Sequence, residues 1–295
     1  MPIHVFSYYR NVLWVRPQTK NKTIFAHFSR GSQLHTGLHT PYGALLRALL
    51  DADWCLQSCV ALDSRRQGVS DLEVMVHAPV PAGQREVVAS WGWPMELPSW
   101  TWDAPAATNL SVNIYSTHAS VQLLINGKPV GAAPVPVSAS TEYTATFVVP
   151  YSTGSLTAIG YDAAGKAVTN KTIVTAGKAA AIKLTPDRAV IRADRSDLSY
   201  VTAEIVDANG VLLPTASIEL TFQVTGASGE LAAVGSGDPA DAGSFYQGVR
   251  ATYLGKAVAI VRPGTSSTAP AAGDITLQVT GGGMTASVDI TVTVE

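Results

Sequence analysis

The stretch "SYVTAEIVDANGVLL" (residues 199–213) shows the pattern that decides the fold of this chain. Apolar and polar residues alternate, which places Val201, Ala203 and Ile205 on one face of an extended strand. Asn209–Gly210 follows directly and favours a chain reversal, because these residue types suit tight hairpin turns. The stretch therefore predicts a strand with one buried face that ends in a turn.

The same alternation recurs on both sides of this stretch. It is seen in "LSVNIYS" (110–116), "SVQLLING" (120–127), "YTATFVVPY" (143–151), "SLTAIGYDAAGKAV" (155–168), "IELTFQV" (218–224) and "ASVDITVTV" (286–294). Asn126–Gly127 predicts a type I′ hairpin, whose two central residues both need positive φ. Many short strands separated by turns are typical of β-sandwiches. We therefore expect an all-β fold with two immunoglobulin-like sandwiches, residues 107–177 and 178–295, joined near Thr175–Gly177, the second of the bacterial immunoglobulin or invasin-like kind.

Residues 1–70 differ from the rest of the chain. The segment "TPYGALLRALLDADWCL" (40–56) predicts a helix, because Thr40 can cap it, Pro41 suits its first turn, and leucines recur at helical spacing. Residues 16–39 show no consistent period. We expect a short, partly helical and irregular N-terminal segment, with residues 16–70 as the least ordered part of the chain.

Between this segment and the sandwiches, residues 71–106 are expected to form a tryptophan-rich linker. The stretch "SWGWPMELPSWTW" (90–102) holds four of the six tryptophans of the chain. One interpretation is a rigid connector, since Pro94 and Pro98 stiffen it. The other is a sugar-binding surface made by the indole rings of Trp91, Trp93, Trp100 and Trp102. The connector is favoured, and sugar contact stays open as the alternative.

The sequence predicts no catalytic residue, metal site or cofactor. Cys55 and Cys59 with His35 and His39 lack the ligand spacing of zinc folds. Asp238 and Asp241, in the loop "GSGDPADAGSF" (235–245), lack the spacing of a calcium loop, and a solvated loop is favoured. Isolated acidic residues are expected on solvated faces or turns: Glu73, Glu96 and Glu204.

Composition limits the partners. Eight Lys/Arg stand against three Asp/Glu in residues 1–70, and twelve against nineteen in residues 71–295, so the larger part is acidic and no nucleic-acid partner is expected. No apolar run is long enough to suggest a membrane span. No secretory signal is visible at the N-terminus, and the compartment stays open, with an extracytoplasmic parent enzyme as an alternative.

Several ordered stretches resemble one family. "VHAPVPAGQREVVASWGWPMELPSWTW" (76–102), "VNIYSTHASVQLLINGKPVG" (112–131) and "GKAVAIVRPG" (255–264) are similar to the region that follows the catalytic barrel in bacterial β-galactosidases of glycoside hydrolase family 2. "SYYRNVLWV" (7–15) resembles the last helix of that barrel. The resemblance covers residues 71–295 and implies two immunoglobulin-like accessory domains. The strands that carry the family's two catalytic glutamates have no counterpart here, so no catalytic residue is carried over.

Three functions follow from these observations. The resemblance implies a non-catalytic accessory portion of a β-galactosidase-like enzyme, which supports the catalytic barrel or contacts carbohydrate. The barrel would then be a partner domain or chain, and the isolated chain is expected to hydrolyse no galactoside. The alternative is an active β-galactosidase, on its own or as a subunit completed by another chain. The third is a surface adhesion or binding module, which fold alone cannot establish.

Overall fold

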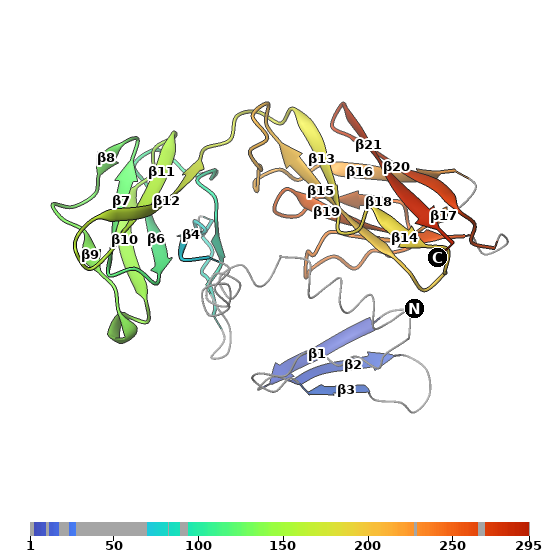
Figure 1. Ribbon diagram of the computed structural model, residues 1–295, viewed down its shortest axis with the longest axis horizontal. Coiled ribbons are helices and arrows are strands. Elements are labelled where there is room, and N and C mark those ends of the chain that lie inside the picture. The colour runs from blue at the N-terminus through green and yellow to red at the C-terminus, as the bar shows by residue number, and fades with distance from the viewer. Residues whose placement is uncertain are drawn as a thin grey trace. The chain divides into compact units, whose positions relative to one another are not determined.

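The structure is a computed structural model. It describes residues 70–81, 83–88, 94–226, 229–264 and 269–294, together with the backbone of residues 3–9, 12–17 and 24–27. Strands dominate the described residues (Figure 1). A 3-10 turn lies at Ala139–Thr141. No helix in these ranges is long and apolar enough to span a membrane. The prediction of an all-β fold is confirmed for the residues that the structure describes.

Near the N-terminus the backbone forms a three-stranded antiparallel sheet. Its order is β1-β2-β3, with β1 (Ile3–Tyr9), β2 (Val12–Pro17) and β3 (Ile24–His27). The resemblance of residues 7–15 to a barrel helix is therefore wrong at the level of local structure. The sequence explains the strands, because all three are rich in Val, Ile, Phe, Tyr and Trp, which favour extended backbone. The helix predicted over residues 40–56 lies outside the described residues.

The first sandwich consists of two facing sheets. One has the order β10-β6-β4-β5, made of β4 (Leu72–His77), β5 (Glu96–Leu97), β6 (Asn109–Ser116) and β10 (Thr144–Pro150). The other has the order β12-β11-β7-β8, and β9 also pairs with β7. Its strands are β7 (Ser120–Ile125), β8 (Lys128–Pro129), β9 (Val135–Pro136), β11 (Ser155–Tyr161) and β12 (Ala167–Val174).

This sandwich begins earlier than the sequence predicts. β4, which was expected in the linker, pairs antiparallel with β6 and aligns Val74 with Ile114. Both side chains are fully buried in the core between the sheets. The linker expected over residues 71–106 therefore includes two strands of the sandwich, β4 and β5. The pairing of β4 with a strand more than thirty residues away is not encoded in local periodicity.

The hairpin predicted at Asn126–Gly127 is confirmed. The two residues have φ angles of 49° and 76°, as a type I′ turn requires, and Ile125 pairs with Lys128 across the turn. The Asn126 side chain adds two bonds to a neighbouring loop. Its Oδ1 accepts from the Ser155 N–H at 2.8 Å, and its Nδ2 donates to the Thr153 carbonyl at 3.1 Å.

The second sandwich also has two sheets. One has the order β13-β15-β19-β17, with β13 (Ala181–Pro186), β15 (Ser199–Val206), β17 (Gly229–Gly235) and β19 (Lys256–Pro263). The other has the order β14-β21-β20-β16-β18, with β14 parallel to β21. Its strands are β14 (Val190–Arg192), β16 (Glu219–Thr225), β18 (Val249–Ala251), β20 (Gly273–Gly281) and β21 (Met284–Thr293).

The predicted buried face of β15 is confirmed. Val201, Ala203 and Ile205 are fully buried and belong to a core that includes Ile275 and Leu277 of the opposite sheet. The reversal after this strand is present, and the Leu213 N–H donates to the Ile205 carbonyl across it at 2.9 Å. Each sandwich has its own hydrophobic core, which confirms the prediction of two immunoglobulin-like β-sandwiches.

Candidate functional site

The tryptophan-rich stretch is the first candidate. Trp91 and Trp93 lie outside the described residues. Trp100 is 0% exposed and packs in the core of the first sandwich. Its indole N–H donates to the Ser152 carbonyl at 2.8 Å, and its ring meets Tyr151 edge-on, with 5.1 Å between the ring centroids. Trp100 therefore has no face open to a sugar in this structure.

Trp102 lies beside the same core and is partly buried. Its backbone N–H donates to the Tyr151 hydroxyl at 3.4 Å. Its indole N–H is buried and has no hydrogen-bond partner among the described residues. The segment between the two tryptophans also holds the chain that leaves β12, because the Thr101 hydroxyl accepts from the Ala176 N–H at 2.8 Å. Sugar contact by Trp91, Trp93 and Trp102 stays a prediction.

The isolated acidic residues are less solvated than the sequence indicates. Glu96 is 5% exposed and accepts from the Asn113 amide at 2.5 Å and from the Tyr115 hydroxyl at 2.9 Å. Glu73 pairs with Lys171, and Glu204 pairs with Lys183 and Lys256. The expectation of freely solvated strand faces or turns is thus wrong for these three residues, because partners from distant strands meet them.

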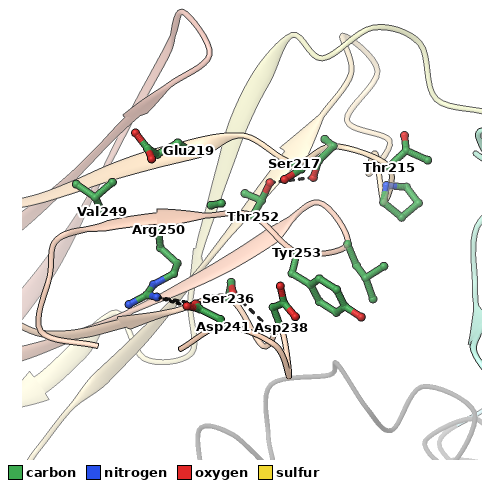
Figure 2. A pocket seen from close by; sticks show the side chains of 14 residues that line it. Thr215, Ser217, Glu219, Ser236, Asp238, Asp241, Val249, Arg250, Thr252 and Tyr253 are labelled. Carbon is green, nitrogen blue, oxygen red and sulfur yellow. Dashed lines mark hydrogen bonds and ion pairs between the residues drawn. The ribbon is translucent and has the colours of Figure 1, made fainter. Parts of the chain in front are cut away.

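A pocket of about 470 Å³ lies at one end of the second sandwich (Figure 2). Three segments line it: the chain that enters β16, the loop between β17 and β18, and β18 with the turn after it. Figure 2 shows Ser236, Asp238 and Asp241 together on the loop, with Tyr253 beside Asp238. Glu219 lies at the opposite end of the lining from Tyr253. The lining therefore combines polar and apolar side chains.

A buried ion pair supports one wall of this pocket. Arg250, on β18, is 7% exposed, and its Nη1 lies 2.7 and 2.6 Å from the two carboxylate oxygens of Asp241. Its Nη2 donates to the Ser244 carbonyl, and the Phe245 ring lies under the guanidinium, 5.7 Å from Cζ. Arg250 thus ties the loop between β17 and β18 to the edge of the sheet.

The electrostatics of Asp241 follow from these contacts. Burial by itself would raise the pKa of this carboxyl group. The hydrogen bonds from the Gly243 N–H and from Arg250, with the positive charge of Arg250, outweigh burial and lower the pKa below its ordinary value. Asp241 is therefore an ionised partner of Arg250. Among the described residues, no three potential metal-ligating side chains lie together.

Asp238 and Asp241 were predicted to lie in a solvated loop, and the pocket was not predicted from the sequence. Arg250, Thr252 and Tyr253 come from a separate segment, and Thr215 and Ser217 from a third. One local signal was available: Arg250 follows Asp241 by nine residues, across a loop rich in glycine and aspartate. The residues that were considered as a zinc site and not favoured lie outside the described residues: Cys55, Cys59, His35 and His39.

Comparisons with known proteins cover both sandwiches. Residues 182–289 match the model of the glycoside hydrolase family 2 C-terminal domain 5, and residues 107–169 match a domain of unknown function, DUF4982. The β-galactosidase BoGH2A of Bacteroides ovatus is 32% identical over 166 residues, which are 56% of this chain and 19% of the relative.

Solved structures agree. A glycosyl hydrolase family 2 member from Bacteroides cellulosilyticus has a TM-score of 0.68 and 29% identity, over 77% of this chain and 29% of that chain. A β-glycosidase from Bacteroides vulgatus has a TM-score of 0.58 and 27% identity, over 66% of this chain and 24% of that chain. The chain thus spans between 19% and 29% of the length of these three relatives. Its two β-sandwiches correspond to the C-terminal region of glycoside hydrolase family 2 enzymes.

Proposed function

We propose that this chain is a non-catalytic accessory portion of a β-galactosidase-like glycoside hydrolase and that it supports the catalytic domain of that enzyme. The observation that carries the proposal is the coverage of the relatives. A match that includes 77% of this chain accounts for 29% of a family 2 structure, and the matching family model is a C-terminal domain. The remaining length of such an enzyme is available for the catalytic domain.

Four carboxyl groups of the second sandwich are unsuited to the role of a catalytic proton donor. Glycoside hydrolysis uses a pair of carboxyl groups, one of which must hold a proton and therefore needs a raised pKa. Four carboxyl groups of the second sandwich have a pKa below the ordinary value: Asp197, Asp207, Glu230 and Asp241. Asp197, Glu230 and Asp241 pair with arginines, and Asp207 accepts backbone hydrogen bonds. Such groups are unsuited to donate a proton at neutral pH.

The position of Trp100 favours support of the catalytic domain over a role in which the tryptophans bind sugar. This side chain is used entirely within the first sandwich, where it packs and donates a hydrogen bond. Part of the stretch that was predicted to be either a connector or a sugar-binding surface therefore belongs to the core of the first sandwich. A packed sandwich that begins at β4 suits a role in holding a neighbouring domain.

A graft tests this proposal. The segment of BoGH2A that matches this chain is deleted, and the corresponding residues of this chain are inserted in its place. We expect the deletion to lower the melting temperature and the aryl-β-galactoside turnover of BoGH2A, and the graft to restore both. The control is the same graft with Trp100→Ala, which weakens the first sandwich and should restore less.

Two results would contradict the proposal. One is a graft that is soluble and folded but leaves stability and turnover at the level of the deletion. The other is turnover by a graft in which the catalytic glutamates of the BoGH2A part have been replaced. The inserted sandwiches would then carry the activity. That second result would favour the alternative of an active glycosidase.

A further inference from the structure

We propose that the pocket at the end of the second sandwich binds a neutral sugar residue. Its volume of about 470 Å³ falls within the range of about 300–1,000 Å³ that is usual for small-molecule sites. Its lining combines carboxylates, hydroxyl groups and one aromatic ring. This inference goes beyond the proposed support role, since a sandwich can bind sugar whether or not it stabilises a catalytic domain.

The charges around the pocket favour a neutral ligand over an anionic one. Glu219, Asp238 and Asp241 contribute three carboxylates, and Arg250 is the guanidinium in the lining. Both oxygens of Asp241 lie within 2.7 Å of Arg250, so this positive charge is already paired. The pocket therefore has a negative excess, and a carboxylate or phosphate group would be repelled.

Asp238 is the best-placed acceptor for a ligand hydroxyl group. Its Oδ1 accepts from the Ala240 N–H at 2.8 Å, and its backbone N–H donates to the Ser236 hydroxyl at 3.4 Å, so the local turn fixes its position. Its Oδ2 accepts no hydrogen bond within the part of the chain that the structure describes. A hydrogen bond from a neutral hydroxyl to an ionised carboxylate is about twice as strong as one between neutral groups.

Tyr253 supplies an apolar surface beside this acceptor (Figure 2). The residue is partly buried and sits on a turn closed by two backbone bonds with Lys256, of 2.9 and 3.0 Å. The turn fixes the backbone from which the ring projects. An aromatic face offers contact to the C–H groups of a sugar ring, while Asp238 accepts from a hydroxyl group at its rim.

The buried Arg250 holds one wall of the pocket in place. Its bonds to Asp241 and to the Ser244 carbonyl anchor the loop that carries Asp238, so the wall is in place before a ligand arrives. Its Nε–H is buried and has no acceptor among the described residues.

The test measures binding of three probes to the full chain: D-galactose, D-glucose and D-glucuronate. Amide chemical shifts are followed by NMR as each sugar is added. We expect saturable shifts confined to residues 214–219, 236–245 and 249–254 with at least one neutral sugar, and weaker binding of glucuronate. Asp238→Asn should lower the affinity for the neutral sugar about tenfold, because one charge-assisted hydrogen bond is lost. It should also reduce the difference in affinity between the neutral sugar and glucuronate.

Matched variants separate the pocket from the fold. Tyr253→Ala should abolish the shifts and Tyr253→Phe should retain them, whereas Tyr246→Ala, at an exposed tyrosine outside the lining, should have no effect. Asp289→Asn, on β21, is the control for Asp238→Asn. No saturable shift with any probe would overturn the inference, as would equal binding by wild type and a folded Asp238→Asn or Tyr253→Ala variant. These outcomes are independent of the graft experiment, so the two proposals can fail separately.

Discussion

At the scale of single residues, Trp100 connects the tryptophan-rich stretch to the first sandwich. Its ring is enclosed by the core, and its N–H is satisfied by a carbonyl 52 residues further along the chain. Clustering of tryptophans in sequence is compatible with both a surface and a core. The distinction depends on which strands enclose the stretch, and this is a property of the assembled sandwich.

We predict that Trp100→Ala lowers the free energy of unfolding of the first sandwich by about 3–5 kcal/mol, because it leaves a large cavity and an unpaired carbonyl. Hydrogen exchange of the full chain should show faster exchange in β6 and β11 and unchanged exchange in β15 and β19. Tyr246→Ala, at a residue that is 80% exposed, is the control and should have little effect. Equal destabilisation by both variants would refute the structural role of Trp100.

At the scale of elements, hairpins and alternating strands were predictable because their signals are local. The φ angles of Asn126 and Gly127 and the buried face of β15 both follow from a few adjacent residues. β4 was readable as a strand, but its pairing with β6 was not, since that depends on a partner more than thirty residues away. The N-terminal strands were missed because short apolar runs fit helix and strand alike.

The candidate pocket also depends on segments that are distant in the sequence. Asp238 and Asp241 were predicted to lie in a solvated loop. In the structure they line a pocket together with Arg250 on the edge strand β18 and Tyr253 on the turn after it, and Arg250 binds Asp241. Polar residues brought together by an edge strand and two loops have no common periodicity. The sequence could therefore indicate the loop, but not the cavity that it lines.

The hairpin offers a test at this scale. Gly127→Val should destabilise the first sandwich by about 1–2 kcal/mol, because φ of 76° places a β-branched residue in the left-handed region. Urea unfolding of the full chain measures the change. The control is Lys128→Val, next in sequence on the exposed strand β8, which we expect within about 0.5 kcal/mol of wild type. A Gly127→Val variant as stable as this control would show that the turn is formed differently.

At the scale of the whole molecule, acid should act on the second sandwich, which holds the four carboxyl groups with lowered pKa. For Glu230, burial would raise the pKa, but hydrogen bonds and charge from Arg195 and Arg262 lower it below the ordinary 4.5. A carboxyl group whose pKa is lowered in the folded state stabilises the fold when the pH is above its ordinary pKa. This stabilisation is lost as the pH falls through the lowered pKa of the folded state.

We therefore expect the urea midpoint of the second sandwich to fall as the pH drops below about 4.5, where the unfolded carboxyl groups begin to bind protons. Glu230→Gln should be less stable than wild type at neutral pH, and its stability should depend less on pH. Hydrogen exchange in β17 and β19 reports on this sandwich directly. A midpoint that rises on acidification, or a pH dependence identical in Glu230→Gln, would contradict the assignment.

The central claim, that the chain is a non-catalytic accessory portion, is tested most directly by its own activity. The measurement is the initial rate of aryl-β-galactoside hydrolysis by the purified full chain, compared with a buffer blank. We expect no turnover above the blank, and loss of any trace activity on further purification. Turnover that persists through purification and disappears when a specific pair of acidic residues in this chain is replaced would contradict it.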